Sequence, residues 1–96
     1  MICPTPDELL CDPQGRPYFL WSEELTLAEF SERLRDPAAA DYWLATLLRQ
    51  AKPDDVYRFV SLAEIARRWP GVRAGVGGRM RDFWDWRVRR WKEHGD

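Results

Sequence analysis

The segment Asp36–Ala51 constrains the fold more than any other part of the chain, because its apolar residues recur at helical spacing. The apolar stripe consists of Ala40, Trp43, Leu44, Leu47, Leu48 and Ala51, opposite a wetter edge of Tyr42, Thr46 and Arg49. Asp36 is expected to cap this helix, and Pro37 fits its first position. A helix with so wide a stripe needs cover on most sides. The rest of the chain is therefore predicted to pack around it.

The length of 96 residues suits one domain with one core. Six Trp, three Tyr and four Phe residues provide much of its apolar surface, because a large aromatic side chain buries about 150–250 Å². We predict an all-α domain, a small bundle of four to five helices with an extended or β-hairpin-like N-terminal arm. Its parts are the arm (1–24), a helical core (25–70), a Gly-rich turn (71–78) and a basic C-terminal helix (79–94).

The N-terminal arm contains residues that favour a tight turn. Asp12 and Pro13 suit the first two positions of a type I turn, and Gly15 can take the positive φ that follows. This turn predicts a hairpin that pairs Leu9–Cys11 with Arg16–Leu20. Three aromatic residues of the arm are expected to lean on the helices: Tyr18, Phe19 and Trp21.

Helix starts in the predicted core are marked by the spacing of capping boxes. The two boxes are Thr26 with Glu29 and Ser61 with Glu64. The first predicts a helix at Thr26–Arg35, and the second predicts a helix that ends at Pro70-Gly71. Between them, Asp54 or Asp55 is expected to cap a short helix.

The C-terminal helix carries a tryptophan away from its apolar stripe. The stripe consists of Met80, Trp84, Val88 and Trp91, with Phe83 beside it. Trp86 lies about 120° from the centre of the stripe, among helical neighbours Arg79, Arg89 and Arg90. Three interpretations remain open: a ring covered by arginine stems, an interface anchor, or a stacking platform for a base. Asp85 is expected to pair with Arg89 in the acid-first i,i+4 order.

The glycines before this helix have two interpretations. Their spacing fails as a dinucleotide fingerprint, because its third glycine would fall on Met80 and no strand precedes it. Glycines at a helix N-terminus can still hold an anion with backbone N–H groups. The candidate anion site consists of Arg73, Gly77, Gly78, Arg79 and Arg81; a plain hinge or turn is the alternative.

The net charge of −1 conceals two halves of opposite sign. Residues 1–48 hold nine acids and three bases, whereas residues 49–96 hold seven acids and twelve bases. The halves are either two faces that attract each other within the fold, or a sign of a functional basic surface. The second interpretation rests on residues 67–92, where nine bases accompany two acids and four tryptophans.

Catalytic and metal motifs do not emerge from the sequence. Cys3 and Cys11 match neither a redox motif nor a zinc knuckle, and the single histidine, His94, stands near the end of the sequence. We therefore predict no catalytic residue, no metal and no cofactor. Free thiols, with no signal peptide or membrane span in the sequence, indicate a cytoplasmic protein.

Five short motifs occur in a recognisable order. They are Arg-Pro-Tyr-Phe-Leu-Trp at 16–21, Leu-Thr-Leu-Ala-Glu-Phe at 25–30, Trp-Leu-Ala-Thr-Leu-Leu-Arg at 43–49, Asp-Val-Tyr-Arg-Phe-Val at 55–60 and Glu-Ile-Ala-Arg-Arg-Trp-Pro at 64–70. This order resembles a family of small bacterial helical proteins often encoded beside nucleotidyltransferases of the abortive-infection toxin type. Members carry an acidic or aromatic pair before the Leu-Thr step, and in this chain that position is Ser22-Glu23-Glu24.

The resemblance implies an antitoxin-like or accessory role, and it supplies no catalytic residue. The predicted function is a non-enzymatic protein that binds a partner protein, with a nucleotidyltransferase toxin as the candidate. The predicted partner-binding residues are Arg79, Trp86, Arg89 and Arg90. The alternative is nucleic-acid binding by the Arg/Trp-rich C-terminal segment.

Overall fold

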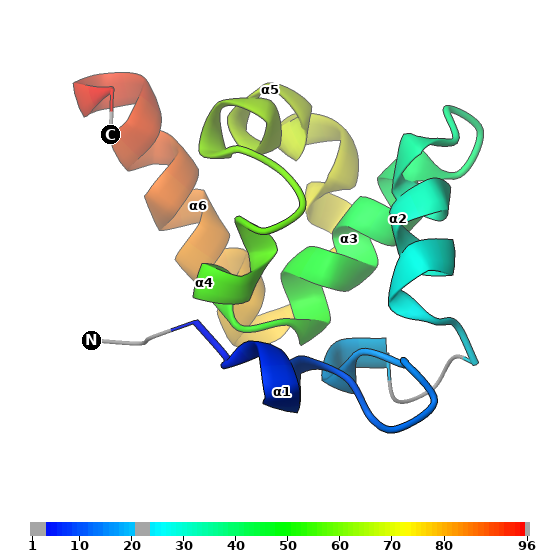
Figure 1. The fold of residues 1–96 in the computed structure, drawn as a ribbon. Coiled ribbons are helices and arrows are strands. Elements are labelled where there is room, and N and C mark those ends of the chain that lie inside the picture. Colours follow the sequence, from blue (N-terminus) through cyan, green and yellow to red (C-terminus); the bar gives the residue numbers. More distant parts are fainter. Residues whose placement is uncertain (1–3, 21–23, 96) are drawn as a thin grey trace.

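The computed structural model describes residues 4–20 and 24–95, and within these ranges the fold is all-α, as predicted. The helical elements are α1 (Asp7–Leu10), η1 (Tyr18–Leu20), α2 (Leu27–Arg35), α3 (Ala40–Gln50), α4 (Pro53–Val56), α5 (Leu62–Val72), η2 (Arg73–Gly75) and α6 (Gly78–His94), where η marks a 3₁₀ helix (Figure 1). Because α1 and α4 have only four residues each, the longer helices α2, α3, α5 and α6 build most of the fold.

Helix α3 lies at the centre of the domain. It contacts α2, α4, α5, α6 and both 3₁₀ helices, and Figure 1 shows α2 and α6 on opposite sides of it. The stripe residues Trp43, Leu44, Leu47, Leu48 and Ala51 are buried, as predicted. The prediction for Thr46 is wrong: it is 3% exposed, because the surrounding elements cover its side of the helix as well. Its hydroxyl donates to the carbonyl of Tyr42 at 3.1 Å, which satisfies the buried group.

The start of α3 also differs from the prediction. Asp36 follows the last residue of α2, and its carboxylate accepts a hydrogen bond from the amide of Ala38 at 3.1 Å. This local bond stabilises a turn at 37–39, so α3 begins only at Ala40, with Ala39 as its N-cap. Asp36 therefore caps no helix N-terminus.

The two capping boxes form to different extents. At α2 the box is complete: the Glu29 amide donates to Thr26 Oγ1 at 3.2 Å, and the Thr26 amide donates to Glu29 Oε1 at 2.9 Å. At α5 the Glu64 amide donates to Ser61 Oγ at 3.1 Å. The Glu64 carboxylate pairs with Arg67 instead of turning back, with Arg67 Nε at 3.0 Å. Both helices nevertheless begin where their cap residues predict.

The predicted helix end at Pro70-Gly71 is wrong, because α5 continues to Val72. Trp69 and Val72 are buried, and their packing holds the last turn in place despite the missing N–H of Pro70. The predicted Gly-rich turn at 71–78 is correspondingly shorter. After η2, only positions 76 and 77 precede α6, which begins at Gly78 with a φ of +61°.

The N-terminal arm is more helical than predicted. The turn is confirmed: the Gly15 amide donates to the Asp12 carbonyl at 2.9 Å, and Gly15 has a φ of +81°. The hairpin shrinks to one antiparallel bridge between Cys11 and Pro17, because α1 and η1 occupy its expected strands. Phe19 leans on the helices as predicted, since it is fully buried and its ring lies 5.3 Å from that of Phe30. The prediction for Trp21 lies outside the described residues.

Candidate functional site

Helix α6 presents one face to the core and another to solvent. Trp84 and Val88 are buried, and the Trp84 indole donates to the carbonyl of Leu48 at 3.1 Å. Trp86 is 47% exposed, as expected for a residue outside the apolar stripe. Because Trp43 and Trp69 are also buried, Trp86 differs from these core tryptophans in presenting a large apolar surface to water.

The ring of Trp86 is held by two neighbours on its own helix. The Phe83 ring lies 6.0 Å from it, and the Arg90 guanidinium stands over it at 6.0 Å from the ring centroid. Phe83 in turn contacts the buried ring of Trp84 at 5.0 Å, and the exposed ring of Tyr57 contacts Trp84 at 6.1 Å. These contacts join the exposed aromatic side chains to the core and limit their freedom.

The predicted ion pair between Asp85 and Arg89 does not form. Asp85 instead accepts hydrogen bonds from Arg73 Nε and Nη2 at 2.7 Å each, and from the Trp69 indole at 2.9 Å. Arg73 first, and then Trp69, lower the pKa of Asp85 to about 2. This geometry ties α6 to the end of α5 and leaves Arg89 exposed.

The candidate anion site brings its residues together only in part. Gly77 and Gly78 form the N-terminus of α6, as the sequence suggests. Arg73 is bound to Asp85, however, and Arg81 Nε donates to the carbonyl of Val76 at 2.7 Å. Arg79 is exposed beside them. Because two of the predicted arginines serve the local fold, the arrangement supports the turn rather than the anion site.

Several arginines of the basic half neutralise acids within the fold. Arg58 pairs with Asp7 at 2.7 Å, and Arg68 pairs with Asp41, so both pairs join the basic half of the chain to the acidic half. Arg67 pairs with Glu64 inside the basic half. These contacts support the interpretation of two faces that attract each other. They also leave fewer cations for an outside partner.

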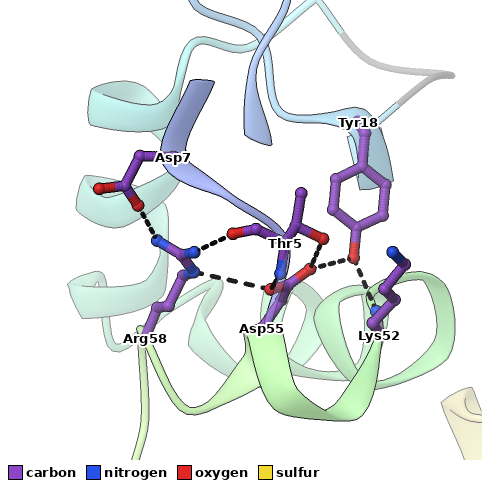
Figure 2. Close-up of polar contacts among 6 residues, drawn as sticks. All are labelled: Thr5, Asp7, Tyr18, Lys52, Asp55 and Arg58. Carbon is purple, nitrogen blue, oxygen red and sulfur yellow. Dashed lines mark hydrogen bonds and ion pairs between the residues drawn. The ribbon is translucent and has the colours of Figure 1, made fainter. Parts of the chain in front are cut away.

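A polar cluster around Asp55 was not predicted as a site. Asp54 or Asp55 was expected to cap this helix, but Lys52 occupies the N-cap position of α4. Asp55 is the third residue of α4 and is fully buried. Figure 2 shows its carboxylate pointing at the N-terminal arm. It accepts from the Thr5 amide at 2.7 Å, the Thr5 hydroxyl at 2.6 Å and the Tyr18 hydroxyl at 2.6 Å. The nearest cation is Arg58, whose Nε lies 3.6 Å away.

The electrostatics of this cluster favour an ionised Asp55. Burial by itself raises the pKa of Asp55, but the hydrogen bonds from Thr5 and Tyr18 outweigh it and hold that pKa below its ordinary value. Burial, and then the bond to Asp55, raise the pKa of Tyr18 to about 12. The Tyr18 hydroxyl also accepts from the Lys52 amide at 2.8 Å. The carboxylate is thus fully engaged, and the cluster fastens the arm to α4.

The described residues assemble no metal site. Among residues 4–20 and 24–95, no three His, Cys, Asp or Glu side chains lie where they could hold a metal ion together. Burial, and then the charge of Asp12, raise the pKa of the Cys11 thiol. The prediction for Cys3 lies outside the described residues. None of the helices formed by the described residues is both long enough and apolar enough to cross a membrane.

Comparison of the chain with family models, with curated proteins and with solved structures found no match. The resemblance to small bacterial helical proteins therefore rests on the sequence motifs alone.

Proposed function

We propose that this chain is a non-enzymatic accessory or antitoxin-like protein that binds a partner protein through the surface around Trp86. The observation that carries the proposal is the 47% exposure of Trp86, a side chain that the core does not use. Arg79, Arg89 and Arg90 are exposed near it. Tryptophan and arginine are the residue types most enriched at interface hot spots, so this surface has the composition of an anchor.

The non-enzymatic part of the proposal is supported by the hydrogen bonds of two carboxylates, Asp55 and Asp85. Asp55 is engaged by Thr5 and Tyr18, and Asp85 is engaged by Arg73 and Trp69. A general acid or base needs a free position that faces a substrate. Both carboxylates instead accept hydrogen bonds from groups within the domain.

The proposed partner is a nucleotidyltransferase toxin, which the sequence motifs imply. Enzymes of that class bind metal with catalytic carboxylates, and exposed arginines are suited to meet them. A surface that covers those carboxylates would block the enzyme. The proposal includes a cytoplasmic location, where the thiols of Cys3 and Cys11 stay reduced.

The test is titration calorimetry with a nucleotidyltransferase encoded beside this chain, produced separately. Trp86→Ala should raise the Kd about 30-fold, which corresponds to about 2 kcal/mol for a hot-spot residue. Its melting temperature should stay close to that of the wild type, because the ring lies outside the core. Tyr42→Ala is the matched control, since Tyr42 is 59% exposed on a different helix. Equal Kd values for the wild type and Trp86→Ala would refute the proposal.

Nucleic-acid binding is the second candidate, favoured by the exposed arginines beside an exposed indole. Arg79→Glu combined with Arg89→Glu tests it better than a change at Arg81, which binds the local backbone. Binding to labelled RNA or DNA should fall steeply with salt and fall further in the double variant. An absence of binding to single- and double-stranded probes at low salt would remove this candidate.

A further inference from the structure

The solvent side of α6 carries exposed residues along almost the whole helix. They follow one another at intervals of three or four residues, so they fall on one face. Figure 1 shows α6 along one margin of the domain, on the other side of α3 from α2. We name this surface the outer face of α6 and define it by Arg79, Asp82, Trp86, Arg90 and Glu93.

The charges of the outer face change sign across Trp86. Arg79 stands seven residues before it, and Glu93 stands seven residues after it. Asp82 stands four residues before it, and Arg90 stands four residues after it. At about 100° per residue, all four lie within about 40° of Trp86 around the helix axis. Each charge on one side of the ring therefore has the opposite charge at the same distance on the other side.

The stability of the helix itself does not explain the two outermost charges. The helix dipole favours acids at a helix N-terminus and bases at a C-terminus. Arg79 lies in the first turn of α6 and Glu93 in its last turn, so each stands where the opposite charge is preferred. Among residues 4–20 and 24–95, no ion pair includes Arg79, Asp82 or Glu93. A contact with a second molecule would give these charges a role.

We propose that the outer face of α6 binds the same face of a second copy of this chain, with the two helices antiparallel and a two-fold axis beside Trp86. In such a pair, positions equally far before and after Trp86 lie opposite each other. Arg79 then meets Glu93 of the second copy, and Asp82 meets Arg90 of the second copy. Each contact occurs twice by symmetry, around a central pair of indoles.

The side chains at the centre suit this arrangement. Trp86 is 47% exposed and gains apolar burial against the indole of the second copy. The Arg90 guanidinium stands over the Trp86 ring, 6.0 Å from its centroid. It can bind a carboxylate of the second copy from that position, because a guanidinium offers several N–H donors. The contact between Arg90 and the ring is therefore kept in the dimer.

Other arrangements of the two helices bring like charges together. Sliding one helix by about one turn places Asp82 against Glu93 in one direction, and Arg79 against Arg89 in the other. Parallel helices in register place every charge against its own copy. Like charges in contact disfavour an interface, so they act against these alternatives. The pattern of charges thus favours the antiparallel pair centred on Trp86.

This inference goes beyond the proposed function, because it concerns the chain without any other protein. A protein that binds the outer face would have to displace the second copy. Self-association would therefore weaken the apparent affinity for such a protein as the concentration of the chain rises.

Analytical ultracentrifugation of the whole chain tests the dimer directly. About four turns of each helix form a small interface, so we expect a dissociation constant on the order of 100 µM at low salt. The mass should rise from 11.4 kDa toward twice that value between about 5 µM and about 1 mM. Added salt should weaken the dimer, because it screens the exposed charges. Trp86→Ala should raise the dissociation constant at least about 30-fold.

The indole N–H signals in a ¹H–¹⁵N correlation spectrum show whether the dimer uses Trp86. Trp86→Phe identifies the Trp86 signal. This signal should move as the concentration of the wild-type chain rises. The signal of Trp84 should stay in place, because its indole is buried and donates to the carbonyl of Leu48.

Reversal of the outermost charges tests the register. Arg79→Glu and Glu93→Arg should each raise the dissociation constant about tenfold, because each places like charges at both symmetry-related contacts. The double variant, Arg79→Glu with Glu93→Arg, restores opposite charges, so its constant should return to within about threefold of the wild-type value. These variants suit the helix dipole better than the wild type does, so a weakened helix cannot cause the losses.

Lys92→Glu is the matched control for Arg79→Glu. Lys92 is an exposed cation of α6 about 120° from Trp86, outside the outer face. Its replacement changes the net charge of the chain by the same amount as Arg79→Glu does. It should change the dissociation constant less than about twofold.

Four results would overturn the inference. These are a monomer throughout the concentration range, equal losses in Arg79→Glu and Lys92→Glu, a double variant as weak as the single ones, or a Trp86 signal that stays in place while the dimer forms. A natural partner separates this inference from the proposed function. If a partner binds through Trp86 while the chain alone stays monomeric, the inference is wrong and the proposed function stands. If the chain dimerises as expected but no partner binding depends on Trp86, the proposed function alone fails.

Discussion

Replacing Asp55 should detach the N-terminal arm and destabilise the whole domain. The side chain is fully buried and accepts three hydrogen bonds, two from Thr5 and one from Tyr18. In Asp55→Ala these donors and the nearby Arg58 lose their buried acceptor together. Removing one partner from such a buried, charged network costs about 3–5 kcal/mol. Since small domains are stable by only about 5–15 kcal/mol, this is a large fraction of the total.

Asp55→Asn separates the charge of this residue from its shape. The amide oxygen can still accept from the Thr5 backbone, but its nitrogen cannot accept from the Tyr18 hydroxyl. That hydroxyl already accepts from the Lys52 amide, so its own proton loses an acceptor. Hydrogen bonds to a charged acceptor contribute about 1.5–3 kcal/mol, against about 0.5–1.5 kcal/mol for neutral ones. We expect Asp55→Asn to cost about 2–3 kcal/mol, less than Asp55→Ala.

Urea denaturation measures these costs, and amide hydrogen exchange locates them. The amide of Thr5 should exchange much faster in Asp55→Ala, because Asp55 is its acceptor. The change should be smaller in Asp55→Asn, whose amide oxygen can still accept from it. Asp54→Ala is the matched control: it lies beside Asp55 in α4, and its loss should cost only a few tenths of a kcal/mol from the helix dipole. A loss below about 0.5 kcal/mol in Asp55→Ala, or unchanged exchange at Thr5 in that variant, would show that the cluster around Asp55 does not fasten the arm.

The pH dependence provides a further check on the same residue. The pKa of Asp55 is lowered in the folded state, so its contribution is present above the unfolded pKa of about 4. It is lost as the pH falls from there through the folded pKa. The stability of Asp55→Asn should therefore fall less steeply with acid than that of the wild type.

Two further predictions concern α3 and the contact between α5 and α6. Leu44→Ala and Leu47→Ala should each cost about 2–5 kcal/mol in urea denaturation, because both side chains are fully buried, and Tyr42→Ala should cost less; equal losses at all three would contradict the assigned helix face. Asp85→Asn should lower the free energy of unfolding by about 1 kcal/mol at pH 7. Its ion pair lowers the pKa of Asp85 to about 2, but solvent weakens this pair because the Arg73 side chain is 48% exposed. In thermal melts this difference should shrink between pH 4 and pH 2, where the wild-type carboxylate becomes protonated; a constant difference would show that the ion pair is not its cause.

Local features of this fold could be predicted from the sequence because their partners are close in the chain. The box at Thr26 and Glu29 and the turn from Asp12 to Gly15 each span four residues. The stripe on α3 and the exposure of Trp86 follow from helical spacing alone. Each of these signals is complete within one or two helical turns.

Contacts between distant segments could not be predicted in the same way. Thr5 lies 50 residues from Asp55, and Tyr18 lies 37 residues away, so no spacing rule connects them. The sequence indicated only a local role for Asp55, as a possible helix cap. Asp85 shows the same limit: the i,i+4 rule favoured Arg89, but packing of α5 on α6 brings Arg73 and the Trp69 indole to its carboxylate. Tertiary packing thus replaced the partner that local spacing favours.

The distribution of ion pairs connects the charged halves of the chain to the candidate surface. Arg58 and Arg68 join the basic half to acids of the other half, and Arg73 serves the contact between α5 and α6. Part of the charge asymmetry of the sequence is thus used inside the fold, which weakens it as a sign of nucleic-acid binding. The positive charge that stays exposed beside Trp86 is confined to one helix. Because a long polyanion needs a continuous basic surface, we expect this arrangement to suit a protein partner better than a nucleic acid.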